Sequence, residues 1–510
     1  MRNSKQFTLK WVLLIALGAV LVGCSMPATT MPSVASTPLQ VDKTKSPEPS
    51  DLTTLPSTRS PDDLAPLPTS ENGVEVDNSQ QNSFLYTVQI NDTLGLIAQE
   101  FGIEWEDLAR FNQLSNPNAL EIGQVLLIPG EDSQVYGPET KLIPDSELVF
   151  GPAAVYLDVR GFSEAQGGYL AVHRDSAEGE MMDGIDMVIK VATEYSVNPK
   201  ILLTLLEYAS GWVRDNNPRT STLEFPLGKK DSRRIGLYAQ LAWAADKLNE
   251  GYYLSKAGIN QSWFTQDGFQ FGASPGINAG TVALQGLMAD IHNEDEWRRA
   301  ISTDGFLATY QLLFGYPFDF AIEPQFPDNL LQPALQLPFE DEVPWVFTGG
   351  PHAAWGFYAA QSALDFAPRG DQLGCWMSAD WVVAAADGLI IRSDDGAVVQ
   401  DLDGDGIGQT GWSILYMHMA EYERVAAGTY VEAGERIGHP SCEGGLASAS
   451  HLHLARRYNG EWIPAYGDLA FNLDGWISVS DGIPYEGWMQ NGDQLLEACE
   501  CYDPAFMLER

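Results

Sequence analysis

His451-Leu452-His453 decides the fold predicted for the C-terminal part of this chain, because it lies in a run that is typical of a β-strand. Side chains on a strand alternate between its two faces, so the two imidazoles reach into one space. Histidine is the commonest metal ligand and is well suited to proton transfer near pH 7. The chain has seven histidines, and five of them fall between His352 and His453. An isolated pair of this kind is usually structural, but the clustering favours a metal site.

Three residues upstream can complete such a site. His352 is the first, Asp365 is a lone carboxylate in the apolar run 362–368, and His418 stands in the alternating run 412–419. Buried carboxylates are rare unless they are paired or bound to metal. Two histidines and one carboxylate around zinc, with a fourth position open to water, form the usual catalytic zinc site. Two further imidazoles could position the water and stabilise the oxyanion.

Four segments of residues 340–480 resemble the lysostaphin-type zinc endopeptidases, peptidase family M23. They occur in order as Gly350-Pro351-His352, Leu364-Asp365-Phe366, Tyr416-Met417-His418 and His451-Leu452-His453. The resemblance implies an all-β antiparallel domain. Glycines that punctuate short apolar strands in this region agree with that expectation.

The resemblance also implies a role for each member of the cluster. In this family the first histidine, the aspartate and the second histidine of the His-X-His pair ligate zinc. The matching residues here are His352, Asp365 and His453. The remaining two histidines assist catalysis in the family, and these correspond to His418 and His451.

The spacing of the first two ligands departs from most of the family. Most members have the first histidine four residues before the aspartate, where this chain has Gln361. Here the interval is 365 − 352 = 13 residues, which is similar to the β-lytic branch with its longer loop. His352 is therefore expected to be the ligand, with an intact site.

Two nearby features match no role in that family. His439 is interpreted as structural or solvent-exposed. Residues 401–406 have the Asp-X-Asp-X-Asp-Gly spacing of a calcium loop, which makes Ca²⁺ a candidate second ion. The twelfth position is Trp412, which cannot supply the usual closing carboxylate, and flanking helices are not predicted. An acidic hairpin tip remains the alternative.

Length and charge limit the possible functions. A chain of 510 residues has room for about three domains. The formal charge of −40, from 69 acidic and 29 basic residues, argues against nucleic acid as a partner.

The N-terminus has the pattern of an export signal. Basic residues precede the apolar run 11–21, and Leu21-Val22-Gly23-Cys24 resembles a bacterial lipobox. The resemblance implies a lipoprotein signal peptide over residues 1–24, with lipid attached to Cys24 outside the cytoplasmic membrane. Residues 25–83, rich in Pro, Ser and Thr, are expected to form a disordered tether.

Four cysteines remain after Cys24, an even number that suggests disulfides in an exported protein. We expect Cys375 to pair with Cys442, because both lie in the peptidase-like region. Cys499 and Cys501 form the second candidate pair. A Cys/His zinc cluster is the rival interpretation, but its spacing does not match the usual zinc ribbons.

Residues 84–130 are expected to form a small β-α-α-β module. The segments that carry this prediction closely resemble a LysM domain: Tyr86-Thr87-Val88, Gly95-Leu96-Ile97-Ala98, Phe111-Asn112 and Ile122-Gly123-Gln124. That family binds glycans that contain N-acetylglucosamine, including peptidoglycan. The loops near Asp92-Thr93 and Asn116-Pro117-Asn118 are the expected sugar contacts.

Residues 145–335 are expected to be mostly helical. Asn198-Pro199 marks a helix start, and the helix that follows is densely apolar except for Glu207. A carboxyl in apolar surroundings has a raised pKa and can serve as a general acid.

This helix and the segments 236–241 and 277–281 resemble the lysozyme-like lytic transglycosylases. Tyr208 stands where that family has serine after its catalytic glutamate, and the second segment has altered spacing. A degenerate helical scaffold or a glycan-binding module therefore remains open beside a second, glycan-cleaving activity.

Taken together, these patterns predict a multidomain envelope protein. A small LysM module, a mostly α lysozyme-like region and an all-β antiparallel peptidase domain are followed by an extension over 481–510. The resemblances imply a wall-bound zinc endopeptidase that hydrolyses peptide bonds of peptidoglycan stems or cross-bridges. The alternative is a non-catalytic peptidoglycan-binding lipoprotein that recruits or activates another hydrolase.

Overall fold

The structure, a computed structural model, describes residues 83–88, 92–100, 105–112, 114, 120, 125–129 and 135–510, apart from 260, 358–359, 371–373, 481, 500 and 502–505. The expected signal peptide and all of the tether except residue 83 lie outside the described residues. So do residues 116–118 and 122–124 of the N-terminal module. Within the described part of the chain, no helix is both long and apolar enough to cross a membrane.

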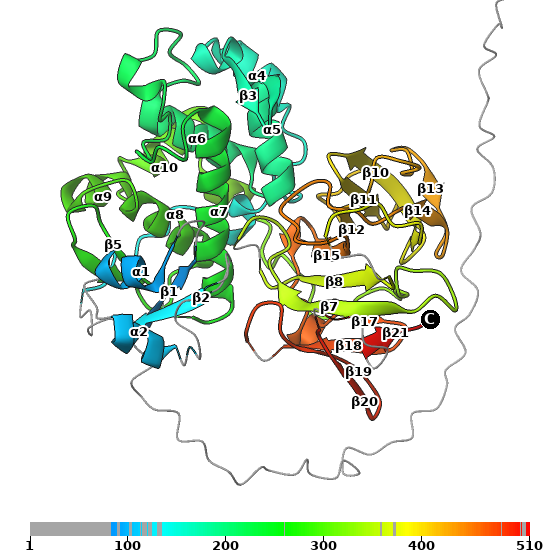
Figure 1. Ribbon diagram of the computed structural model, residues 1–510. Helices are drawn as coiled ribbons and strands as arrows, with labels where there is room; N and C mark the ends of the chain where they lie inside the picture. The colour runs from blue at the N-terminus through cyan, green and yellow to red at the C-terminus, as the bar shows by residue number, and fades with distance from the viewer. Residues whose placement is uncertain are drawn as a thin grey trace, which may run out of the picture. The chain divides into compact units, whose positions relative to one another are not determined.

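The N-terminal module has the predicted β-α-α-β order (Figure 1). Its elements are β1 Ser83–Thr87, α1 Leu94–Glu100, α2 Trp105–Phe111 and β2 Val125–Pro129. The two strands pair antiparallel, with Ser83 opposite Pro129 and Thr87 opposite Val125. Apolar side chains of both helices and of β2 form its core, including Ile97, Leu108 and Leu126.

The middle of the chain is helical, as predicted. Its helices are α3 Asp145–Leu148, α4 Val159–Gln166, α5 Gly184–Tyr195, α6 Pro199–Ser210, α7 Leu237–Lys256, α8 Ala279–Ala289, α9 Glu294–Ala300 and α10 Phe306–Phe314. Two small hairpins accompany them, β3 Arg174–Ala177 with β4 Glu180–Asp183, and β5 Ser262–Phe264 with β6 Gln270–Gly272.

The start and the end of α6 show why this sequence forms that helix. Pro199 occupies the first turn, where a missing N–H costs nothing, and the Asn198 side chain accepts a hydrogen bond from the Lys200 N–H at 2.9 Å. Gly211 ends the helix with a left-handed φ of 76°, which glycine adopts without steric cost.

The C-terminal part is built around one antiparallel sheet in the order β13-β10-β11-β12-β15-β8-β7-β21, with β16 paired to β15 (Figure 1). The sheet strands are β7 Trp345–His352, β8 Ala363–Pro368, β10 Gly388–Asp394, β11 Ala397–Asp401, β12 Trp412–Met417, β13 Tyr430–Val431, β15 Leu452–Tyr458, β16 Glu461–Trp462 and β21 Met507–Leu508. A short pair is formed by β9 Val382–Val383 and β14 Arg436–Gly438.

Residues 481–510 contribute strands to this part of the molecule. A four-stranded sheet contains β17 Asn472–Leu473, β18 Trp476–Val479, β19 Trp488–Asn491 and β20 Gln494–Glu497 in sequence order. The last strand, β21, pairs with β7, with Leu508 opposite Trp345. The strand that ends in His352 therefore has the C-terminal strand β21 as its neighbour in the sheet.

One face of the C-terminal sheet shares a hydrophobic core with the helical region. The sheet residues of this shared core are Ala363, Ala397, Val399, Leu415, Met417, Ala455 and Trp462, which join residues of the helical region in a single cluster. The opposite face has a core of its own, which includes Leu454 and Tyr416. Because strand residues alternate, Ala455 and His453 lie on the same face, as do Ala363 and Asp365. The histidine cluster and the shared core therefore occupy the same face of the sheet.

Polar contacts reinforce this junction. The Ser196 hydroxyl donates to the Gly460 carbonyl at 2.5 Å, and the Trp462 N–H donates to the Tyr253 hydroxyl at 3.0 Å.

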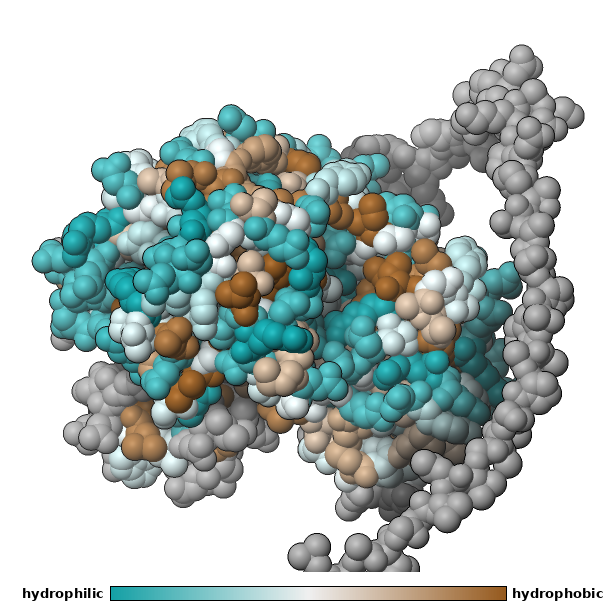
Figure 2. All heavy atoms as spheres, turned by 90° about the horizontal axis from the view of Figure 1, so that it is seen from above, coloured by the Kyte–Doolittle hydropathy of each residue, from teal (hydrophilic) through white to brown (hydrophobic). Residues whose placement is uncertain are grey.

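The outer surface of the molecule is more polar than this junction. Figure 2 shows a face on which hydrophilic residues predominate and hydrophobic residues are scattered, as expected for a chain of this charge.

Both expected disulfides are formed. Cys375 bonds to Cys442, with 5.6 Å between their Cα atoms, and Cys499 bonds to Cys501. The preferred pairing is thus confirmed. The rival Cys/His metal cluster is wrong, because all four cysteines are consumed.

Candidate metal centre

Strand pairing brings the predicted ligands together. His453 on β15 lies directly opposite Asp365 on β8, and β7 runs along the other edge of β8 to end at His352. The β7–β8 register shifts twice between Phe347 and His352, which turns the end of β7 toward the site. A Cβ on Gly349 would lie 2.9 Å from the Asp365 Oδ2, so glycine leaves room there for the carboxylate.

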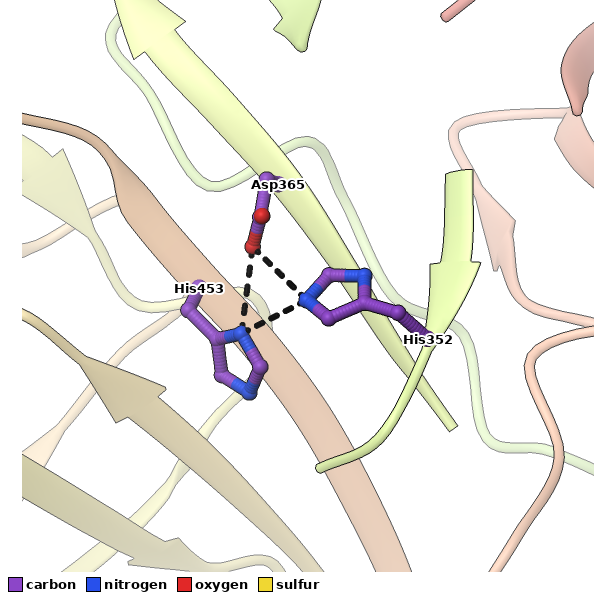
Figure 3. Close-up of side chains that lie close together, drawn as sticks. All are labelled: His352, Asp365 and His453. Carbon is purple, nitrogen blue, oxygen red and sulfur yellow. Dashed lines mark hydrogen bonds and ion pairs between the residues drawn. The ribbon is translucent and has the colours of Figure 1, made fainter. Parts of the chain in front are cut away.

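The three donor atoms form a tight triangle (Figure 3). The His352 Nε2 lies 3.0 Å from the His453 Nδ1. The Asp365 Oδ1 lies 3.1 Å from that Nδ1 and 3.3 Å from the His352 Nε2. All three residues are buried. Ligands about 2.0–2.1 Å from a tetrahedral zinc ion stand about 3.3 Å apart, so the triangle fits zinc.

The outer ring nitrogens explain which atoms face inward. The His352 Nδ1 lies 2.8 Å from the Gly350 carbonyl, and the His453 Nε2 lies 3.0 Å from the Ala354 carbonyl. A carbonyl only accepts, so each of these nitrogens donates its N–H. In its neutral form each ring therefore presents a lone pair to the centre, which is the arrangement that orients metal-binding histidines. Two lone pairs and a carboxylate at such short range repel one another unless a cation lies between them.

The electrostatics of Asp365 agree with this arrangement. Burial alone would raise the pKa of its carboxyl, but the imidazoles of His352 and His451 outweigh burial and hold that pKa well below its usual range. Burial lowers the pKa of His453. An ionised aspartate and a neutral histidine are the states in which these residues bind zinc.

His418 and His451 stand beside the three donors. Their ring centroids are 4.5 Å apart, and the His451 Nε2 lies 3.6 Å from the Asp365 Oδ2. His418 directly follows β12 and has a positive φ of 64°, a strained conformation that often marks functional sites. Burial, together with His451 and His453, lowers the pKa of His418 to about 3, so this ring is neutral near pH 7.

Tyr485 is a site residue that sequence reasoning missed. Its ring stacks on His352, with centroids 4.1 Å apart and an interplanar angle of 19°. The Gly350 N–H donates to its carbonyl at 2.6 Å, and its own N–H donates to the Pro351 carbonyl at 3.2 Å. The sequence gives little sign of this contact, because Tyr485 follows the last motif by about thirty residues. A turn in the C-terminal residues brings its ring to His352.

His439 lies apart from the cluster of the other four histidines. This position agrees with its interpretation as a structural residue. Its Nδ1 is 2.9 Å from the Asp380 carbonyl and its Nε2 is 3.4 Å from the Glu423 carboxylate. Its ring also packs on Trp381, with centroids 3.9 Å apart.

Glu207 lies near the end of α6 and is half-buried. Burial raises the pKa of its carboxyl, as expected. The same carboxylate accepts a hydrogen bond from the Arg214 N–H at 3.1 Å, which braces the turn after the helix. This contact gives the glutamate a structural role, and the glycan-cleaving activity stays a prediction.

Two histidines and one aspartate that converge in this way form a donor set of the kind that holds catalytic zinc. Residues 372–464 match the Peptidase family M23 model, residues 86–129 match the LysM domain model, and residues 141–327 match the model "LasA, N-terminal domain". The helical region, expected to be lysozyme-like, is thus matched by a different family. The M23 match begins after His352 and Asp365, so the structure supplies the evidence that these two residues join the site.

Two curated relatives are the Protease LasA of Pseudomonas aeruginosa strains UCBPP-PA14 and PAO1. Each is 28% identical to this chain, over 298 and 294 residues, covering 54% of this chain and 66% of the relative. The matched part is thus just under two thirds of the relatives' length. Among solved structures, the M23 metalloprotease pseudoalterin is 21% identical, with 35% of this chain and 99% of that chain covered and a TM-score of 0.29. The catalytic domain of lysostaphin from Staphylococcus simulans is 24% identical, with 24% and 87% covered and a TM-score of 0.17.

The helical region holds the loop between the first two zinc donors. Asp246 on α7 accepts a hydrogen bond from the Phe357 N–H at 2.9 Å. Gly356 permits this approach, because it has a φ of 65° and a Cβ there would lie 2.5 Å from the Asp246 Oδ1. Burial raises the pKa of Asp246 to about 7.

This raised pKa predicts a pH-dependent gain in stability from Asp246→Asn. A carboxyl with a folded pKa above its unfolded value stabilises the fold fully below about pH 4, and that contribution is lost as pH rises to about 7. Asparagine keeps the acceptor oxygen without ionising. We expect the variant to exceed the parent by on the order of 1–4 kcal/mol at pH 8. Little difference is expected at pH 4.

Urea unfolding of the full chain at pH 4 and pH 8 measures this effect. The exposed Asp304→Asn serves as the control and should change neither midpoint. An equal gain for Asp246→Asn at both pH values would show that ionisation is not the cause.

Proposed function

We propose that this protein is a wall-bound zinc endopeptidase that hydrolyses peptide bonds in peptidoglycan stems or cross-bridges. The convergence of His352, Asp365 and His453 on one point, with His418 and His451 beside them, carries the proposal. These residues come from four separate segments, and a structural histidine cluster would not require inward lone pairs next to a buried carboxylate.

The proposed roles follow from the hydrogen bonds. His352, Asp365 and His453 would hold zinc, which supplies Lewis acidity and lowers the pKa of bound water. The His418 Nδ1 lies 2.9 Å from the Glu443 carbonyl, and the His451 Nδ1 lies 2.8 Å from the Ala449 carbonyl. Both rings therefore donate Nδ1–H to the backbone, which leaves Nε2 as the ring atom that can take up a proton from the neutral form. One Nε2 accepts the proton of the attacking water, and a protonated imidazole can return it to the leaving amine.

The match to the LysM family supports a glycan anchor for the enzyme. Binding of the polymer by that module raises the local concentration of peptide substrate without new chemistry. A lipid on Cys24 would hold the chain at a membrane, outside the cytoplasm. The two disulfides are consistent with an oxidising, extracytoplasmic compartment.

Digestion of purified peptidoglycan by the full chain tests this function. We expect mass spectrometry to find new peptide amino and carboxyl termini, and a zinc chelator to abolish them. The full chain is preferred to an isolated 340–480 fragment, because excision would expose the sheet face that packs on the helical region.

Glu207→Gln separates peptide cleavage from glycan cleavage. We expect this variant to yield the same products as the parent, since its carboxylate braces a turn. New sugar ends in parental digests that vanish in Glu207→Gln would instead establish a second, glycan-cleaving activity.

Zinc content separates the enzyme from the non-catalytic alternative. A protein that only recruits another hydrolase has no need of a bound metal. About one zinc ion per chain together with chelator-sensitive cleavage supports the enzyme, whereas a zinc-free and inert protein that still binds the wall supports the adaptor.

A further inference from the structure

The loop between β11 and β12 gathers three carboxylates that the peptidase site does not use. Asp401, Asp403 and Asp405 each offer an oxygen, and these atoms all lie within 4.8 Å of one another. The backbone is wound to make this possible, with positive φ angles of 74° at Gly404 and 84° at Gly406.

Asp401 gives a second, independent sign of a ligand. It is fully buried, and its Oδ1 has no hydrogen-bond partner among the described residues. The other oxygen, Oδ2, accepts from the Gly406 N–H at 2.8 Å, which fixes the carboxylate within the cluster. In the part of the chain that the structure describes, no lysine or arginine forms an ion pair with any of the three aspartates. A buried carboxylate oxygen without a partner is costly, and a cation removes that cost.

We propose that the loop spanning residues 401–411 binds Ca²⁺ through the carboxylates of Asp401, Asp403 and Asp405. Calcium prefers oxygen ligands and tolerates flexible geometry, whereas zinc prefers nitrogen and sulfur. The site differs from a helix-flanked calcium loop, because it joins two strands and has Trp412 at the twelfth position. Water and backbone carbonyls would supply the further oxygen ligands that calcium takes. Such an open site binds calcium in the range of about 10⁻⁴–10⁻³ M.

The charge distribution agrees with this geometry. Burial, with the neighbouring charges of Asp403 and Asp405, raises the pKa of Asp401 to about 6. The carboxylates therefore destabilise one another when no cation is present, and a bound cation reverses the sign of that interaction.

Calcium in this loop would stiffen the junction between the sheet and the helical region. The Gly411 N–H donates to the Asn459 Oδ1 at 3.0 Å, and the Asn459 N–H donates to the Gly411 carbonyl at 2.9 Å. The Asn459 side chain also donates to the Gln325 carbonyl, beyond α10, at 3.2 Å. Asn459 thus links the end of the loop, at Gly411, to Gln325 of the helical region.

Calcium titration of the zinc-loaded full chain tests the proposal. We expect millimolar Ca²⁺ to raise the melting temperature by several degrees, with a smaller effect of Mg²⁺ and with zinc content unchanged. Terbium is a second probe, because Trp412 adjoins the loop through the Leu402 N–H to Trp412 carbonyl bond and can sensitise its emission. Calcium should displace that signal.

Asp403→Asn and Asp405→Asn are the test variants, because both positions are exposed and the changes should not prevent folding. We expect each to lower the calcium affinity at least tenfold and to lose most of the terbium emission. Asp493→Asn, at the exposed tip of the β19–β20 hairpin, is the matched control and should behave as the parent does. A parent that calcium does not stabilise, or full responses in both variants, would overturn the proposal. Neither result would alter the outcome of wall digestion, which depends on the separate zinc site.

Discussion

Asp365→Ala is expected to yield a folded protein that retains far less than one zinc ion per chain and cleaves the wall at least about 10³-fold more slowly. The carboxylate supplies one of three donors, and its removal leaves two imidazoles whose inner nitrogens lie 3.0 Å apart. Metal catalysis contributes several kcal/mol to transition-state stabilisation, and each 1.36 kcal/mol is a factor of ten in rate.

Zinc content by elemental mass spectrometry and the rate of peptide release measure this effect together. Far-ultraviolet circular dichroism checks that the variant is folded. The exposed Asp468→Ala serves as the control and should keep both zinc and rate. A parental zinc content and rate in Asp365→Ala would refute the ligand assignment.

His418→Ala and His451→Ala should show the opposite combination, with zinc retained and turnover reduced by about 10²–10⁴-fold. Neither ring belongs to the donor triangle, and both rings lie beside it. Loss of general acid–base help should therefore appear in kcat while metal content stays near one per chain.

His439→Ala is the matched control for these variants. It removes a buried histidine from the same region, but its ring is paired with Glu423 and packs on Trp381. We expect His439→Ala to release peptide at the parental rate below its melting temperature, although its free energy of unfolding should be somewhat lower. A loss of activity equal to that of His418→Ala would show that general damage, and not proton transfer, explains the result.

The donor triangle could be predicted because four short motifs resemble those of a known family, and local patterns agree with that resemblance. Alternation along a strand places His451 and His453 on one face, and a lone Asp365 in an apolar run signals an unusual partner. Antiparallel pairing then sets His453 opposite Asp365. The interval of 13 residues between His352 and Asp365 is compatible with one site, because irregular pairing of β7 with β8 brings His352 to the other two donors.

Contacts between distant segments could not be predicted in this way. Tyr485 reaches His352 through a turn of the C-terminal residues, and Asp246 reaches the loop before Asp365 from a different region. Neither contact leaves a periodic pattern in the sequence. The carboxylate of Glu207 accepts from the Arg214 N–H in the turn after its helix, and the acid role that its apolar helix suggested stays a prediction.

The core that joins Ala455 and Trp462 to the helices has a practical consequence for protein engineering. Lytic chimaeras are assembled by exchanging catalytic and targeting modules as interchangeable cassettes. In this protein one face of the C-terminal sheet packs on the helical region, so a transplant that follows the sequence motif alone would expose an apolar surface. A transplanted C-terminal sheet would therefore have to carry the helical region with it.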